Sequence, residues 1–176
     1  MKVLSVIGTR PQYIKIKPFD DCLRSLGVAH SIVDTNQHFS PLVSDVFVSE
    51  FGLSISHNLH IPNTDQMEFI ATSICKLRDV FESEKPDLIV VTGDTNSTLS
   101  GAIAANKMRI PLAHLESGIR SGNRNRPEEI NRIITDDLSD VHFISREKDD
   151  KNVLNPVYVG DMEYILLNSY FKDLDI

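Results

Sequence analysis

Short apolar runs alternate with longer amphipathic stretches along the chain. The runs indicate buried strands, since a strand covered on both faces is apolar throughout, and the stretches repeat apolar residues at helical spacing. The clearest run is DLIVVT, residues 87–92. The pattern predicts strands at Lys2–Ile7, His30–Asp34, Asp87–Thr92, Pro111–Leu115, Val141–Ile144 and Val157–Val159, and helices at Gln12–Leu26, Ser40–Phe51, Asp65–Glu84, Asn96–Lys107, Pro127–Leu138 and Met162–Phe171.

Strands that alternate with helices predict an α/β fold, in which helices cover both faces of an open parallel sheet. The chain has 176 residues, 41% hydrophobic and 24% charged, which is typical of one globular domain. No linker, internal repeat or low-complexity tract interrupts the alternation. We therefore expect a single domain over residues 1–176.

Charge and composition exclude several function classes. The net charge of −7 argues against a protein that binds nucleic acid through a basic surface. No segment approaches the roughly 18 apolar residues of a membrane span, and the amino terminus lacks the apolar core of a signal peptide. The two cysteines, Cys22 and Cys75, form no CxxC pair, so we expect two buried free thiols in a reducing cytoplasm.

Polar segments follow four of the predicted strands, where an open parallel sheet binds its ligands. These segments are residues 8–15, 34–38, 93–97 and 116–126. None of them is a G-x-G-x-x-G, Walker or G-x-S-x-G motif, so dinucleotide, nucleotide-hydrolysis and esterase chemistry lack their usual signals. Together the four segments predict a ligand site of another kind.

Cations and acids are both candidates at this edge. Arg10 and Lys15 lie at the mouth of the first helix, where backbone N–H groups favour anions, although two solvated cations would look the same. Asp94 is either a helix cap or a site acid, and Glu128 either a first-turn acid or a site acid, whereas Glu116 directly follows a strand. Four arginines follow in the same part of the chain, namely Arg120, Arg124, Arg126 and Arg132. If the three carboxylates converge beside these arginines, they suit general acid–base catalysis.

The histidines give weaker signals. His57 and His60 resemble a metal-binding pair but have no third ligand at a suitable spacing, so no metal site is predicted. His38 closes a polar segment after a strand and is the best functional candidate. His114 lies within a predicted strand and is expected to be structural.

Five motifs in this order resemble the non-hydrolysing UDP-N-acetylglucosamine 2-epimerase family. They are GTRPQ (8–12) with Lys15, TNQH (35–38), GDT (93–95), HLESGIR (114–120) and PEEINR (127–132), and the resemblance extends from residue 1 to about residue 164. It implies a Rossmann-like domain that equals one half of a two-domain, GT-B-like enzyme. Members convert UDP-N-acetylglucosamine to UDP-N-acetylmannosamine, for surface polysaccharides, by removing the sugar C2 proton, eliminating UDP and adding it back.

The resemblance assigns roles to individual residues. Asp94, Glu116 and Glu128 match the acids of proton transfer and elimination. Arg10, Lys15 and His38 match substrate contacts, and we add Arg120 and Arg132 to the substrate-binding group. No cofactor is implied.

The chain also departs from the family pattern. Members are about twice as long and have a second domain, which supplies a catalytic His and most uridine contacts, and Gln12 stands where many members have Glu. We expect an N-terminal half-site that acts on a UDP-sugar together with a separate second domain, and a homo-oligomer stays open. The alternative is a catalytically inactive half-domain kept for nucleotide-sugar binding or assembly.

Overall fold

A computed structural model describes residues 1–37, 52–62 and 64–160 of the chain. The helices predicted at 40–51 and 162–171, and the candidate His38, lie outside the described residues.

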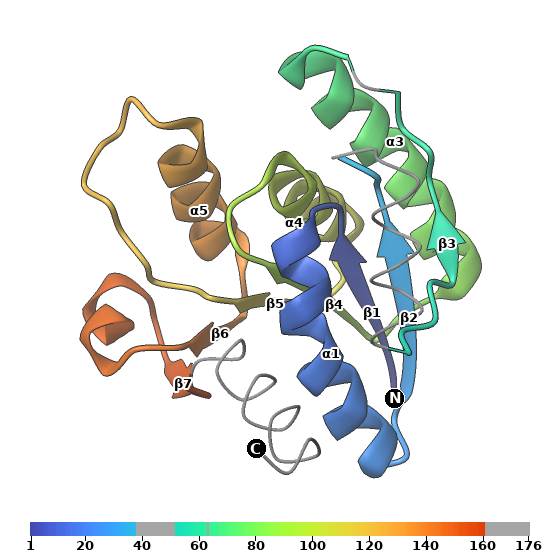
Figure 1. Ribbon diagram of the computed structural model, residues 1–176, viewed down its shortest axis with the longest axis horizontal. Helices are drawn as coiled ribbons and strands as arrows, with labels where there is room; N and C mark the ends of the chain where they lie inside the picture. Colours follow the sequence, from blue (N-terminus) through green and yellow to red (C-terminus); the bar gives the residue numbers. More distant parts are fainter. Residues whose placement is uncertain (38–51, 63, 161–176) are drawn as a thin grey trace, which may run out of the picture.

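The described chain forms one parallel sheet of seven strands, in the order β3-β2-β1-β4-β5-β6-β7 (Figure 1). The chain moves outward from β1 in one direction and from β4 in the other, so the topological switch point lies between these two neighbours. The strands are β1 (Lys2–Ile7), β2 (Ala29–Asp34), β3 (His57–Asn58), β4 (Leu88–Thr92), β5 (Leu112–Leu115), β6 (Val141–Ile144) and β7 (Pro156–Tyr158).

Helices cover both faces of this sheet. One face packs against α1 (Arg10–Ser25), and the other against α3 (Gln66–Glu84) and α4 (Asn96–Met108), with α5 (Pro127–Leu138) beside α4. A short 3-10 helix, η1 (Glu147–Asn152), follows β6. The expected α/β Rossmann-like architecture is confirmed.

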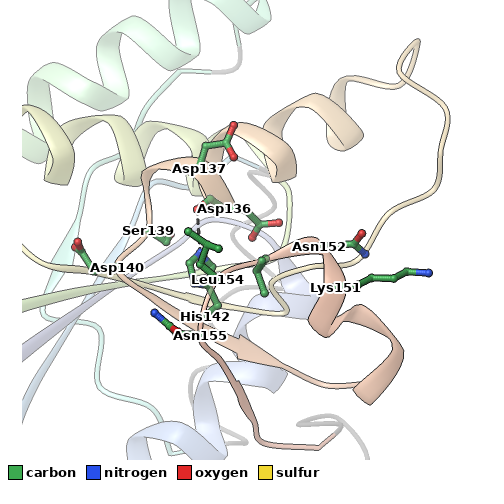
Figure 2. A pocket seen from close by; sticks show the side chains of 10 residues that line it. Asp136, Asp137, Ser139, Asp140, His142, Lys151, Asn152, Leu154 and Asn155 are labelled. Atoms are coloured by element: carbon green, nitrogen blue, oxygen red, sulfur yellow. Dashed lines mark hydrogen bonds between the residues drawn. The ribbon is translucent and has the colours of Figure 1, made fainter.

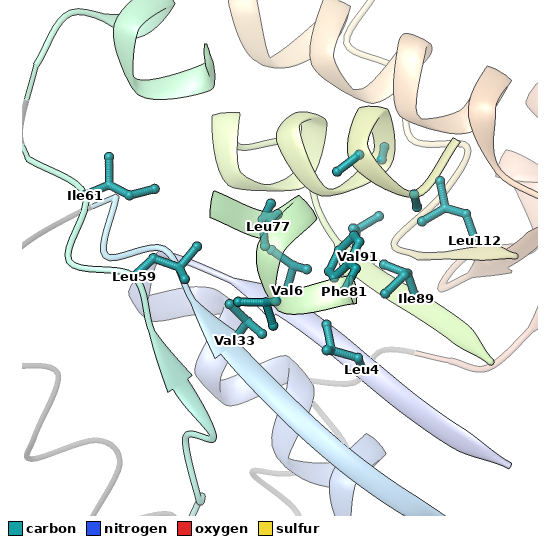
Figure 3. Packing of buried hydrophobic residues seen from close by; sticks show 14 of the residues in the cluster. Leu4, Val6, Val33, Leu59, Ile61, Leu77, Phe81, Ile89, Val91 and Leu112 are labelled. Carbon is teal, nitrogen blue, oxygen red and sulfur yellow. The ribbon is translucent and has the colours of Figure 1, made fainter. Parts of the chain in front are cut away.

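The central strands are apolar on both faces, as the uninterrupted runs predict. In β1, Leu4 and Val6 pack into the cluster under α3 and α4 (Figure 3), while Val3 and Ile7 pack into the cluster under α1. All four side chains are fully buried. Successive residues of a strand point to opposite faces, so one short run supplies both halves of the core.

Each predicted element in the described residues matches the structure to within two residues at both ends. Helix α1 starts two residues early, at Arg10, because Pro11 fits the first turn, where its missing N–H costs least. Neither β3 nor η1 was predicted, since both are too short to produce a period. The expectation of buried thiols is wrong, because Cys22 and Cys75 are both exposed. In the described residues we find no helix with the length and hydropathy of a membrane span.

An ion cluster connects the two-residue strand β3, which pairs with β2, to the end of α3. Glu84, the last residue of α3, lies 2.5 Å from Lys2 Nζ and 2.6 Å from His57 Nε2. It therefore connects the end of α3 to the start of β1 and to β3. The hydrogen bond from Lys2, followed by that from His57, lowers the pKa of Glu84 from 4.5 to about 2.

Replacing Glu84 should reduce stability in a pH-dependent way. Because the folded-state pKa lies below the unfolded one, the contribution of Glu84 is present above about pH 4.5 and is lost as the pH falls towards 2. Glu84→Gln should therefore lower the free energy of unfolding at pH 7 by about 1 kcal/mol, the upper end for pairs that solvent reaches. Urea unfolding measures this, with the exposed Glu82→Gln as control. An equal loss at pH 7 and pH 2.5 would contradict the account.

Candidate functional site

Lys15 and Glu116 meet at the carboxyl ends of the central strands. Lys15 is on the second turn of α1, and Glu116 directly follows β5. The distances from Lys15 Nζ to Glu116 Oε1 and Oε2 are 2.9 Å and 3.0 Å. Gly93, which directly follows β4, also lies close to the Glu116 carboxylate. A Cβ added at Gly93 would be 3.2 Å from Glu116 Oε2. Segments that follow β1, β4 and β5 thus converge on one carboxylate.

Arg132 of α5 connects the two acids that follow β4 and β5. Its Nη2 donates to Asp94 Oδ2 and its Nη1 to the backbone oxygen of Glu116, both at 2.5 Å. The neighbouring Asn131 donates to the backbone oxygen of Asp94 at 3.0 Å. Asp94 and Glu116 therefore lie beside one another, and each carboxylate has a cation within hydrogen-bonding distance.

The third predicted acid is placed differently. Glu128 is exposed, in the first turn of α5. It precedes Arg132 by four residues, so the two side chains lie on the same face of the helix. Glu128 is therefore on the side of α5 that faces Asp94 but further out towards solvent.

The structure places the predicted substrate-binding residues Arg10 and Arg120 in different segments. Arg10 is exposed at the first position of α1. Arg120 donates to Asp136 at 2.6 Å, and it also donates to the backbone oxygens of Ile119 and Asn152. Arg120 thus contacts Asp136 rather than Asp94 or Glu116.

Glu116 occupies a backbone conformation that needs support. Its φ of 64° lies in the left-handed region, which costs a residue with a Cβ about 1–3 kcal/mol. Next to it, Asp136 accepts hydrogen bonds from Ser117 Oγ and from the backbone N–H of Gly118. Burial would raise the pKa of Asp136, but its hydrogen bonds, chiefly to His114, outweigh burial and lower this pKa to about 2.

Gln12 holds the other side of the site. Its Oε1 accepts from the backbone N–H groups of Gly8 and Thr9 at 2.8 and 3.0 Å. Its Nε2 donates to the backbone oxygen of Thr92 at 2.6 Å and approaches the hydroxyls of Thr95 and Thr98. A neutral amide can accept and donate at once, whereas a carboxylate can do so only when it is protonated.

The segment after β2 docks on the start of α4. Gln37 Oε1 accepts from both the backbone N–H and the hydroxyl of Ser97, at 2.9 Å. Gly8 lies so close that a Cβ there would come within 2.2 Å of the Ser97 and Thr35 hydroxyl oxygens. Glycine is required at this position by the close approach of two segments.

Glu129, beside Glu128, has a structural role that its motif did not reveal. It is buried and accepts from the backbone N–H groups of Ser121 and Gly122. The hydrogen bond from the Ser121 backbone N–H is the main reason why the pKa of Glu129 is lowered. Glu129 thus holds the loop that leads into α5.

A buried Ser–His–Asp alignment lies elsewhere, under α1. Ser5 Oγ is 2.8 Å from His30 Nε2, and His30 Nδ1 is 2.7 Å from Asp20. The order matches that of a hydrolase triad, but Ser5 is fully buried in the middle of β1 and cannot reach a substrate. Burial lowers the pKa of His30. The alignment is therefore a polar contact between the sheet and α1.

One described cavity lies away from the acid pair. It has a volume of about 390 Å³ and lies between the end of α5 and the segment before β7 (Figure 2). Asp136 and His142 line it, but Asp94 and Glu116 do not. Among the described residues no three His, Cys, Asp or Glu side chains are grouped so that they could hold a metal ion. His57, one of the two histidines that resemble a metal-binding pair, instead forms a hydrogen bond with Glu84.

Comparisons with known proteins bear on this geometry. The family model described as UDP-N-acetylglucosamine 2-epimerase matches residues 21–158. The chain belongs to this family. The UDP-N-acetylglucosamine 2-epimerase of Methanocaldococcus jannaschii is 39% identical over 155 residues, which cover 88% of this chain and 42% of the relative. The UDP-2,3-diacetamido-2,3-dideoxy-D-glucuronate 2-epimerase of Pseudomonas aeruginosa is 41% identical over 145 residues, covering 81% and 41%.

Solved structures agree with the family assignment. The Neisseria meningitidis UDP-GlcNAc 2-epimerase bound to UDP-GlcNAc has a TM-score of 0.93 and 34% identity, covering all of this chain and 50% of that one. The chain thus spans about half the length of the family members it matches. The order of the five motifs and the α/β fold predicted from the sequence agree with this membership.

Gln12 provides the sharpest test of how the site is held together. Gln12→Met keeps the volume but leaves the buried Gly8 and Thr9 N–H groups without their acceptor. We expect the free energy of unfolding to fall by about 2–4 kcal/mol, since each buried unsatisfied donor costs roughly 1–3 kcal/mol. Chemical denaturation measures this, with the exposed Gln66→Met as control. A loss below that of the control would show that the network is dispensable.

Proposed function

We propose that this chain is the amino-terminal half-site of a UDP-N-acetylglucosamine 2-epimerase. The observation that carries the proposal is the pairing of Asp94 and Glu116 through Arg132, with Lys15 on the second carboxylate. Family membership supports the same reaction class, because relatives with this name share the fold and 34–39% of the aligned residues.

The reaction needs a base at one face of the sugar and a way to release and recapture a diphosphate. A carboxylate removes the proton from sugar C2, and the bond from C1 to UDP breaks to leave a glycal. A proton then adds to C2 from the opposite face while UDP forms the bond to C1 again, so that C2 is inverted. Glu116 and Asp94 are the proposed proton-transfer groups, since a base must come within about 3 Å of the proton or act through one water. Glu128 is proposed as a third acid that a bound sugar would bring into use.

Anion binding is assigned to the start of α1. Arg10 and Lys15 belong to the first two turns of this helix, where their charges and the helix dipole attract a diphosphate. Arg132 orients the acids and contributes positive charge. His38 and Arg120 stay in the proposed substrate-binding group on the strength of the sequence motifs.

Completion of the site requires a second half. We propose that residues 1–176 form one domain and that a second domain, on another chain or beyond the present sequence, supplies the remaining contacts with the nucleotide. A catalytically inactive binding or assembly half-domain is the alternative. A homo-oligomer and the cytoplasmic location both stay predictions.

A uronate is the second candidate substrate. The Pseudomonas aeruginosa relative, whose name specifies a UDP-diacetamido-glucuronate, is as similar to this chain as the Methanocaldococcus jannaschii epimerase. Both substrates would undergo the same proton removal at C2. Assays should therefore offer both nucleotide sugars.

Deuterium exchange at C2 tests the function directly. In D2O, the chain mixed with the carboxyl-terminal part of a relative should place deuterium at C2 of UDP-GlcNAc, and the chain alone should be slower by several orders of magnitude. Asp94→Asn and Glu116→Gln should each slow exchange at least about 100-fold, the usual range for a lost acid or base. The exposed Glu82→Gln serves as control.

Three results would change the proposal. Turnover near the enzyme median of about 10 per second by the chain alone would contradict the half-site. Full exchange by both amide variants would remove Asp94 and Glu116 from the mechanism. Nucleotide-sugar binding without exchange, even in the mixture, would favour the binding half-domain.

A further inference from the structure

We propose that Asp136 is the positioning residue of this site, holding in place both strand-end turns that carry Glu116 and Asp94. The inference rests on the proposed function for the use of those two acids. Asp136 itself lies 4% exposed in the last turns of α5 and is not among the groups assigned to the substrate.

Four donors surround the Asp136 carboxylate. Oδ1 accepts from His114 Nδ1 and Ser117 Oγ, both at 2.6 Å. Oδ2 accepts from the Gly118 N–H at 3.1 Å and from Arg120 Nη1 at 2.6 Å. These partners lie before and after Glu116 in the chain, so one carboxylate fixes both sides of the residue that has a left-handed backbone.

His114 extends the contact to the second acid. Its other ring nitrogen, Nε2, lies 2.7 Å from the backbone oxygen of Gly93, which directly precedes Asp94. The His114 ring therefore bridges the Asp136 carboxylate and the backbone oxygen of Gly93. The path from Asp136 through His114 to Gly93 is fully buried, and each step is a hydrogen bond.

The packing leaves the Glu116 turn little room to settle elsewhere. A Cβ at Gly118 would lie 2.7 Å from the backbone oxygen of Asp149 in η1. On the opposite side, Arg132 holds the backbone oxygen of Glu116. The turn thus contacts both α5 and η1, and Asp136 accepts from its Ser117 hydroxyl and Gly118 N–H.

Asp136→Asn is the variant that tests this arrangement. Gly118 N–H and Arg120 can only donate, so an NH2 group in place of Oδ2 opposes both of them. An NH2 group in place of Oδ1 removes the acceptor of the His114 and Ser117 hydrogen bonds. The matched control is Asp137→Asn, an exposed aspartate on the next position of the same helix. Ser117→Ala, which removes a single donor, is the milder variant in case the amide does not fold.

The readout is the reactivity of Lys15 towards an amine-acylating reagent, measured by mass spectrometry on the 176-residue chain. Lys15 reports on Glu116, and Lys17, which pairs with Asp21 on the same helix, is the internal reference. The side chains are similarly exposed, at 15% and 19%. Global loss of stability would raise both rates, whereas a displaced Glu116 turn raises only that of Lys15.

We expect Asp136→Asn to raise the ratio of Lys15 to Lys17 labelling about five-fold or more, the factor for roughly 1 kcal/mol of local stability. Ser117→Ala should raise it less, and Asp137→Asn should leave it unchanged. An unchanged ratio in both Asp136→Asn and Ser117→Ala overturns the proposal. No nucleotide sugar is present, so this failure is separate from a failed exchange assay, which would instead overturn the function.

Discussion

Buried charge on one face of α5 is the constraint on which the site depends. Glu129, Arg132 and Asp136 follow one another at three- and four-residue spacing and are 6%, 7% and 4% exposed. A buried charge is tolerated only with partners that replace its hydration. All three find these partners in segments outside the helix, so α5 cannot dock without arranging those segments.

The consequences reach from the helix to the chemistry. Glu129 holds the loop before α5, Arg132 joins the Asp94 and Glu116 turns, and Asp136 supports the Glu116 turn from behind. On the far side, Gln12 ties the first loop to the end of β4. The apolar core builds the sheet, but hydrogen bonds between polar side chains and backbone determine where the two acids lie.

Much of this could be predicted from the sequence, and the failures have physical causes. The apolar runs predicted every central strand. The rule that ligands bind beyond the strand ends predicted that Asp94 and Glu116 lie at the same edge of the sheet. Periodicity misleads in α5, where Ile134 is 37% exposed while Arg132 is buried. Asp136 was missed because its role depends on partners that lie 16 to 22 residues away in the chain. The charges at positions 129, 132 and 136 were the available signal, since such spacing defines one helix face.

Hydrogen exchange in Arg132→Met tests the central claim most directly. Two backbone amides report on the site: the Gly93 N–H, which donates to Leu115, and the Ser117 N–H, which donates to Phe143. The reference is the Thr35 N–H, which donates to Ile7. If buried charge on α5 organises the site, Gly93 and Ser117 should exchange about five-fold faster or more in the variant, while Thr35 stays unchanged. Unchanged exchange at Gly93 and Ser117, or an equal increase at all three amides, would show that α5 only packs against the domain and does not organise the site.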